Sequence, residues 1–332
     1  MSQFKHVKHA IQVENLAKSF TIRHTQQGMF NTLKGLFRPK TETLHAINHL
    51  NFEVKQGEKV AFIGPNGAGK STTIKMLTGI LHPSEGMINV LGFTPWKERR
   101  KLGYRIGTVF GQRSQLWYHL PAADTFSLLS KIYEIPQNVY QTRLKELTET
   151  FSIGPLLSKP VRQLSLGERM RCEIVASLLH RPDILFLDEP TIGLDINGKL
   201  MIRNLLNKLA EDHGTTIFLT SHDTADIEQI CERVLILDKG ALIMDSSINN
   251  LKRTFIKKKI VSLVLSKESI SLNLEGVTVR QSAPYHYSFE VDLAVVSLDK
   301  VIHEALKESS VLDITIEDPT MEEIIREIYN KP

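Results

Sequence analysis

Apolar and polar positions alternate through the first part of the chain in a way that predicts β-strands. Residues 11–22 (IQVENLAKSFTI) alternate as a half-buried strand does. Residues 45–64 (HAINHLNFEVKQGEKVAFIG) contain two more apolar runs, and the second of them ends at a glycine-rich turn. We therefore expect three strands here, the last leading directly into that turn.

A helical pattern fills the middle of the chain, and buried strands follow it. Residues 71–81 (STTIKMLTGIL) and 138–152 (NVYQTRLKELTETFS) carry apolar side chains at helical spacing. Beyond residue 181, ILFL and TTIFLTS are short continuous apolar runs, which are typical of parallel strands covered on both faces. Residues 198–214 between them predict a helix, so the pattern indicates an α/β protein.

The pattern weakens after a hairpin predicted at Lys239 and Gly240, and we place a domain boundary near residue 246. The later segments KKIVSLVLS, YSFEVDL, SLDKVIHEALKES and VLDITIED predict strand, strand, helix and strand. These are enough for a small α+β unit. The 332 residues thus divide into a main domain, 1–245, and an accessory domain, 246–332.

Composition argues against several classes of protein. A net charge of +4 does not indicate a dedicated nucleic-acid surface. Cys172 and Cys231 lack CxxC spacing, which argues against structural zinc and disulfides and fits a reduced cytosolic chain. The N-terminus lacks the apolar core of a signal peptide, and no stretch reaches the roughly 20 apolar residues that span a bilayer. We expect any membrane role to depend on another chain.

The glycine-rich turn GPNGAGKS, residues 64–71, carries the first chemical motif. It fits G-x-x-x-x-G-K-[ST] between a predicted strand and a predicted helix. Backbone N–H groups in such a turn face phosphate oxygens, Lys70 adds a full charge, and Ser71 would place its hydroxyl on Mg²⁺. The predicted phosphate site consists of Gly64, Pro65, Asn66, Gly67, Ala68, Gly69, Lys70, Ser71 and Thr72.

Two carboxylates end the buried strand in ILFLDEP, residues 184–190. Side chains at the carboxyl end of a parallel strand face the crevice in which ligands bind. Asp188 would hold Mg²⁺, and Glu189 would orient and deprotonate the attacking water. The two motifs together predict hydrolysis of a nucleoside triphosphate.

GPNGAGKST, LSLGE, LFLDEP, TIGLD and TSH follow one another along the chain in this order, and as a set they resemble the ATP-binding cassette (ABC) ATPases over residues 11 to about 245. The resemblance implies an α/β fold, namely a P-loop NTPase cassette whose RecA-like core carries an antiparallel β subdomain and a helical subdomain at about 113–182. It also implies ATP and Mg²⁺ as cofactors.

The resemblance assigns roles to further residues. Gln112 matches the loop glutamine that reaches Mg²⁺, and His222 matches the switch histidine that bonds the γ-phosphate. Phe20 stands where a tyrosine commonly stacks on adenine, and Asp195 lies in the loop that communicates across a cassette dimer. The implied catalytic set is Lys70, Gln112, Glu189 and His222, and the implied metal set is Ser71, Gln112 and Asp188.

The signature segment LSLGE departs from the family pattern at two positions. In the family two cassettes pack head to tail, so Ser165, Gly167 and Glu168 are expected at the nucleotide of the second copy. Leu166 replaces a glycine, which is tolerable if its backbone avoids the left-handed region. Glu168 replaces a glutamine, and its carboxylate would be unfavourable beside a triphosphate unless it points away or is paired.

Finer features resemble export cassettes of the ABC-2 group, including viologen and sodium exporter ATPases: VFGQRSQLWYHLP, the pair LSLGERMR and TIGLD, and IEDPTMEEIIREIY. We predict an ATPase that drives export through separate integral membrane ABC-2 permease subunits. It would act as a dimer of two copies at the cytoplasmic face of the membrane, with no nucleic-acid partner. One alternative is a soluble cassette ATPase that acts on nucleic acid or on the ribosome. Another is a cassette that binds ATP only to regulate the C-terminal unit, without turnover.

Two segments keep several interpretations. Residues 23–43 are interpreted as an insertion, with Phe30, Leu33, Leu36 and Phe37 at helical spacing. The insertion would contact the edge of the adenine, the permease or the lipid surface, or it is a variable loop without such a role. The other segment is a run of basic residues. It either contacts membrane headgroups or a partner protein, or is simply a solvated face: Lys252, Arg253, Lys257, Lys258 and Lys259.

Overall fold

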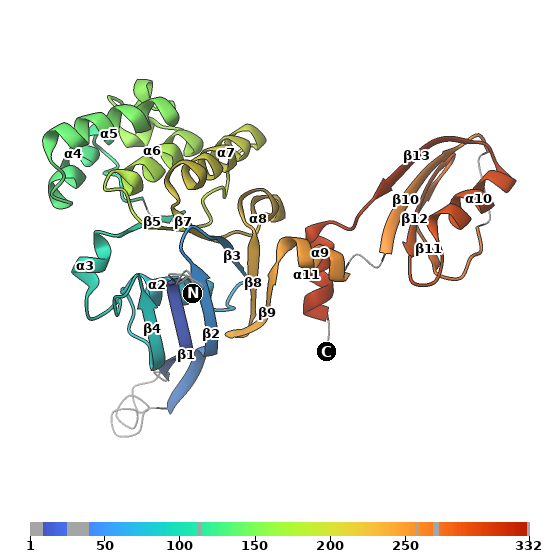
Figure 1. Cartoon of the computed structure of the whole chain (residues 1–332), viewed down its shortest axis with the longest axis horizontal. Helices are drawn as coiled ribbons and strands as arrows, with labels where there is room; N and C mark the ends of the chain where they lie inside the picture. Colours follow the sequence, from blue (N-terminus) through green and yellow to red (C-terminus); the bar gives the residue numbers. More distant parts are fainter. Residues whose placement is uncertain (1–8, 25–39, 112–113, 256–257, 268–271, 331–332) are drawn as a thin grey trace, which may run out of the picture. The chain divides into compact units, whose positions relative to one another are not determined.

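The computed structural model describes residues 9–24, 40–111, 114–255, 258–267 and 272–330. The chain divides into two compact units, Met1–Asp245 and Ser246–Pro332, each of which is described by itself (Figure 1). None of the helices in the described ranges has the length and apolar character that a membrane-spanning helix needs.

A six-stranded sheet in the order β5-β6-β7-β3-β8-β9 forms the centre of the first unit. Its first five strands pair in parallel. The carboxyl ends of parallel strands lie along one edge of the sheet, where ligands bind in such folds. The strands are β3 (Lys59–Ile63), β5 (Ile106–Phe110), β6 (Ile184–Asp188), β7 (Thr216–Thr220), β8 (Arg233–Asp238) and β9 (Ala241–Ser247).

The central strands are buried on both faces, as their continuous apolar runs predict. Every residue of β7 is buried, and so are the first four of β6. The rings of Phe62 and Phe218 lie 5.1 Å apart between centroids, and Phe186 packs against Phe218 at 5.7 Å. Such pairs add about 0.5–1.5 kcal/mol each beyond area burial, so the strands that carry the site have a rigid base.

A three-stranded antiparallel sheet, β2-β1-β4, completes the β structure of this unit. Its strands are β1 (His9–His24), β2 (Lys40–Lys55) and β4 (Glu85–Val90). The boundaries predicted for the 23–43 insertion are wrong, because β1 and β2 stay paired as far as His24 and Lys40. Residues 25–39, with the predicted helical face, lie outside the described residues.

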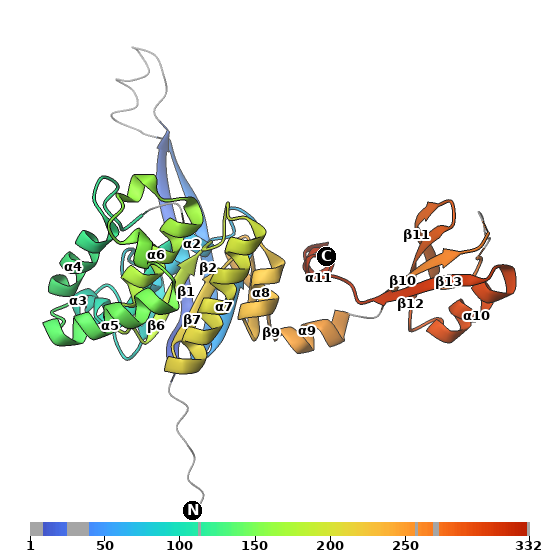
Figure 2. The same ribbon diagram turned by 90° about the horizontal axis from the view of Figure 1, so that it is seen from above.

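Helices flank the six-stranded sheet, and α4, α5 and α6 gather in one group between β5 and β6 in the chain (Figures 1 and 2). This group corresponds to the predicted helical subdomain. The helices of the unit are α2 (Lys70–Leu77), α3 (Arg99–Gly103), α4 (Ala122–Ile132), α5 (Gln137–Thr150), α6 (Leu166–Leu178), α7 (Ile196–His213) and α8 (Thr224–Ile230), with 3₁₀ turns at Gly154–Leu156 and Val161–Gln163.

The second unit is a four-stranded antiparallel sheet in the order β11-β12-β10-β13, with three helices. Phe289 lies in its core with Val301 and Ala305 of α10. The sequence pattern missed β11, α9 and α11; β11 is an edge strand with largely exposed side chains, and the two helices are short. The elements are α9 (Ile248–Phe255), β10 (Lys258–Leu265), β11 (Val277–Ala283), β12 (His286–Asp292), α10 (Leu298–Glu308), β13 (Val311–Glu317) and α11 (Met321–Asn330).

Candidate active site

The predicted phosphate loop joins β3 to α2 at the carboxyl edge of the parallel sheet. Gly67 and Gly69 have φ of 84° and 103°, a region that side chains rarely adopt. A Cβ on Gly69 would also come within 2.7 Å of the Ala46 carbonyl oxygen, and one on Gly64 within 2.7 Å of the Leu237 carbonyl oxygen. The loop therefore needs its glycines for backbone conformation and for close packing.

Lys70 is the first residue of α2, and its side chain folds back over the loop. Its Nζ donates hydrogen bonds to the carbonyl oxygens of Gly64, at 2.6 Å, and Pro65, at 3.1 Å. Burial lowers the pKa of Lys70, and the nearby charges of Glu189 and Asp188 oppose that shift. The ammonium is thus within electrostatic range of both carboxylates.

Asp188 ends β6 and faces the start of α2. Ser71 Oγ lies 3.4 Å from Asp188 Oδ2, and Thr220 Oγ1 donates to Oδ1 at 2.6 Å. A hydroxyl and a carboxylate are the hard oxygen ligands that Mg²⁺ takes together with phosphate oxygens. The sequence analysis missed Thr220, whose signal is a hydroxyl at the end of the neighbouring strand.

Glu189 has the geometry of a general base. Its Oε2 accepts the His222 backbone N–H at 3.2 Å, and His222 Nε2 lies 3.4 Å from Oε1. Within the described part of the chain, Oε1 is buried and accepts no hydrogen bond. Burial raises the pKa of Glu189, while His222 and Lys70 lower it. Oε1 therefore keeps an acceptor lone pair, beside the His222 ring, that no described residue fills.

The backbone of Glu189 is unusual. Its φ of 56° lies in the left-handed region, at a residue whose side chain is only 18% exposed. Such a conformation costs on the order of 1 kcal/mol or more and persists only where the surroundings enforce it. Here the Glu189 N–H donates to the Thr220 carbonyl at 3.1 Å, which fixes the turn after β6 against β7.

The signature segment starts α6 with a capping box. The Glu168 backbone N–H donates to Ser165 Oγ at 3.2 Å, and Glu168 Oε2 accepts the Ser165 N–H at 2.8 Å. That second bond is the largest cause lowering the pKa of Glu168. The carboxylate is thus occupied by its own helix start, where the Ser165 hydroxyl is a further cause that lowers the pKa of Glu168.

Leu166 is the first helical residue of α6, so its backbone lies outside the left-handed region. Its side chain packs on the TIGLD loop, where a Cβ on Gly193 would lie 2.8 Å from Leu166 Cδ2. Gly193 itself has φ of 72°. Asp195 then caps α7 by accepting the Gly198 N–H at 3.1 Å. The signature helix and the TIGLD loop are therefore fitted to each other within one chain.

The contacts described above do not include two of the predicted residues. Phe20 lies on β1 opposite Leu44, and Lys18 Nζ sits 5.1 Å from the centroid of its ring. Gln112 lies outside the described residues. The adenine role of Phe20 and the metal role of Gln112 stay predictions.

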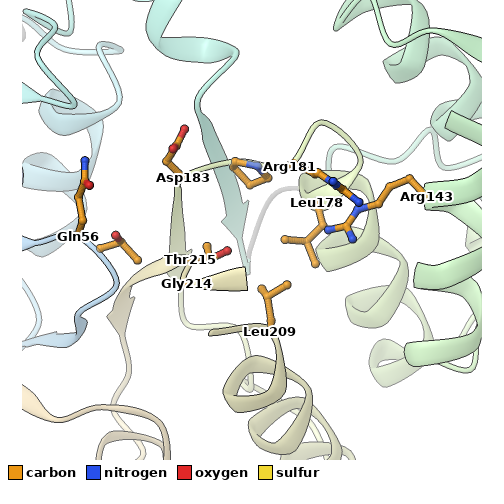
Figure 3. Close-up of a pocket in the computed structure, with 10 residues that line it drawn as sticks. Gln56, Arg143, Leu178, Arg181, Asp183, Leu209, Gly214 and Thr215 are labelled. Carbon is orange, nitrogen blue, oxygen red and sulfur yellow. The ribbon is translucent and has the colours of Figure 1, made fainter. Parts of the chain in front are cut away.

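A cavity of about 270 Å³ lies in the first unit, at the amino ends of β3, β6 and β7 (Figure 3). It is at the edge of the sheet opposite the phosphate loop. Arg143 and Arg181 border it, but Glu146 pairs with both guanidinium groups, at 2.9 and 4.0 Å. The cavity is separate from the candidate active site.

The fold and the site together define a nucleotide-hydrolysing P-loop cassette. The family model described as ABC transporter matches residues 47–192. The bacitracin transport ATP-binding protein BcrA of Bacillus licheniformis is 34% identical over 68% of this chain and 71% of its own. The daunorubicin resistance ATP-binding protein DrrA3 of Streptomyces coeruleorubidus is 31% identical over 84% of this chain and 89% of its own length.

A solved structure has the same fold: the ATP-binding cassette MJ0796, in a dimeric post-hydrolysis state bound to ADP and Pi. It matches with a TM-score of 0.59 and 26% identity over 72% of this chain and 98% of that one. The chain belongs to the ABC transporter family and is an ATP-binding, ATP-hydrolysing subunit. The predicted family, fold class and ATPase activity are confirmed, whereas the viologen-type narrowing stays a prediction.

Proposed function

We propose that this ATPase powers export through separate membrane permease subunits of the ABC-2 type, at the cytoplasmic face of the membrane. The relatives named for bacitracin transport and daunorubicin resistance support export as the direction of transport. No substrate is assigned, because selectivity would belong to the permease. Nothing in the comparisons supports the nucleic-acid alternative.

The observation that carries the hydrolytic part of this proposal is the orientation of Glu189. Its buried Oε1 accepts no hydrogen bond from the described residues, while Oε2 is held by the backbone of His222. Glu189 would accept the proton of the attacking water, and His222 would hold that water against the γ-phosphate. Ser71 and Asp188 would hold Mg²⁺, which offsets charge on the phosphates during transfer.

A second copy of the chain is the partner that the signature segment requires. Ser165 is exposed at the start of α6, where its hydroxyl would reach the γ-phosphate of the other copy. Ile192 and Ile196, next to the exposed Asp195, are themselves exposed at 45% and 78%. Apolar side chains at such a loop favour burial against another protein surface.

The permease contact has support in the segment after Gln112. Trp117 and Tyr118 are exposed at 47% and 56%, and Leu120 is also exposed. Large aromatic side chains are enriched at protein interfaces and are seldom left in water as a group. We assign these three residues to the surface that meets the permease.

Glu189→Gln tests the proposed site. Glutamine keeps the size and the acceptor facing the His222 N–H but cannot take up a proton, so ATP should bind with unchanged affinity while turnover falls by about 100-fold or more. ATP should then trap a dimer that sizing chromatography detects. Lys70→Ala is the matched control, since it should lose nucleotide affinity instead. Wild-type turnover in Glu189→Gln would exclude Glu189 as the base.

A further inference from the structure

Behind the candidate active site lies a buried carboxylate that the reaction itself does not use. Asp226, on α8, is fully buried. Its Oδ1 accepts a hydrogen bond from Arg203 Nε at 2.6 Å, and its Oδ2 accepts one from Ser221 Oγ at 2.7 Å and another from Thr191 Oγ1. The carboxylate thus joins α7, the end of β7 and the loop after β6.

Two of these partners belong to the segments that carry the site. Thr191 lies two residues after Glu189, and Ser221 directly precedes His222. Both hydroxyls meet the same oxygen of Asp226. Because all three groups are buried, separating either hydroxyl from Asp226 would cost a buried hydrogen bond. One carboxylate oxygen therefore links the two segments, in addition to the backbone bond from the Glu189 N–H to the Thr220 carbonyl.

The arrangement is anchored on the far side by α7. Arg203 also contacts Asp223 at 3.1 Å, and Lys199 pairs with Asp223 at 2.7 Å. Two cations thus face two carboxylates, which is the pairing that buried charged side chains need. Asp223 reaches neither Thr191 nor Ser221 with its side chain; it caps α8 by accepting the Ala225 N–H.

We propose that Asp226 is a positioning residue for ATP hydrolysis, which holds Glu189 and His222 in register by binding Thr191 and Ser221. The proposal rests on the proposed roles of Glu189 and His222. Proton transfer from water depends on alignment within a fraction of an ångström, and a displacement of about 1 Å can cost about 100-fold in rate. Asp226 acts without touching nucleotide.

The test is Asp226→Asn in the full chain. Asparagine keeps the shape but supplies only one acceptor oxygen, so it cannot serve both Oδ positions. We expect kcat to fall by about 10- to 100-fold, with the KM for ATP changed by less than about twofold. Asp223→Asn is the matched control, because it makes the same charge change in the same network and should retain kcat within about threefold.

The background of His222→Ala separates positioning from general stability. If Asp226 acts by aligning the two catalytic groups, Asp226→Asn should add less than about threefold to the loss already caused by His222→Ala. Losses that multiply in full, or an unchanged kcat in Asp226→Asn, would overturn the proposal. A wild-type rate in His222→Ala alone would instead refute the proposed site.

Two milder variants cover the case in which Asp226→Asn does not fold. Ser221→Ala and Thr191→Val each remove one hydroxyl that binds Asp226. Each should lower kcat by about threefold or more while ATP binding is kept, since one of the two segments is released. Wild-type kcat in both variants would overturn the proposal.

Discussion

At the scale of single residues, the environment of Glu189 differs from that of a glutamate in water. Burial raises the pKa of Glu189 from its ordinary value of 4.5, and the proximity of His222 and Lys70 limits the rise. A base must be ionised to act, so activity rises with pH through this raised pKa. The motif ILFLDEP placed the carboxylate, but its burial and its pairing with His222 depend on contacts far apart in sequence.

The pH profile of kcat tests this environment. At saturating ATP, kcat should fall as the pH is lowered through an apparent pKa above 4.5, because protonated Glu189 cannot accept a proton from water. Steady-state assays between about pH 5 and about pH 8 would measure the fall of kcat on the acid side of the profile. A flat profile, or the same limb in the residual activity of Glu189→Gln, would contradict the assignment.

Glu168 yields a second prediction at this scale. Glutamine can accept the Ser165 N–H as the carboxylate does, so Glu168→Gln should change the free energy of unfolding by less than about 1 kcal/mol and leave ATP-driven dimerisation unchanged. Glu168→Ala removes that half of the capping box and should destabilise by about 0.5–2 kcal/mol. Chemical denaturation measures the free energy of unfolding of both variants. Tighter dimerisation of Glu168→Gln would mean that the carboxylate does face phosphate.

At the scale of elements, apolar patterning predicted the parallel strands well, because strands covered on both faces must be apolar throughout. It could not predict how far β1 and β2 extend, since the pairs beyond the predicted strands, such as Arg23 and Thr41, are polar residues held by backbone pairing. Nor could it find the hydroxyl contacts of Thr220, Thr191 and Ser221. These depend on which strand ends become neighbours.

The fit between α6 and the TIGLD loop yields a prediction for a pair of elements. Gly193→Ala should destabilise the protein, because its Cβ would meet Leu166 Cδ2 and its φ is 72°. In a Leu166→Ala background the contact disappears and only the backbone strain is left. Unfolding free energies of the four proteins should therefore show coupling of about 0.5–3 kcal/mol. Strict additivity would mean that the two elements pack independently.

For the whole molecule, the proposed dimer implies that each ATP site needs two chains. Lys70→Ala removes the phosphate contact of its own chain. Gly167→Asp adds a charge at the signature, and its Cβ would meet only Leu194 Cδ2, at 3.8 Å, so the fold should tolerate it. Each variant alone should be inactive, because every site in it lacks one half.

Mixing the two variants tests the arrangement. A mixed dimer has one site with both defects and one intact site, so an equal mixture should recover about a quarter of wild-type activity by random pairing. The measurement is ATPase activity against mixing ratio, with each variant alone as the control. If each chain formed its site by itself, mixing would restore nothing.

The left-handed backbone of Glu189 bears on how such variants are interpreted. Glutamine and alanine at this position inherit a similar torsional penalty, so these variants are compared with the native chain on nearly equal terms. Glycine alone would escape it and could give a sturdier but inactive protein. Thermal stability and catalytic activity are therefore in conflict at position 189. Selecting a library of variants for stability alone would favour glycine there and lose the activity.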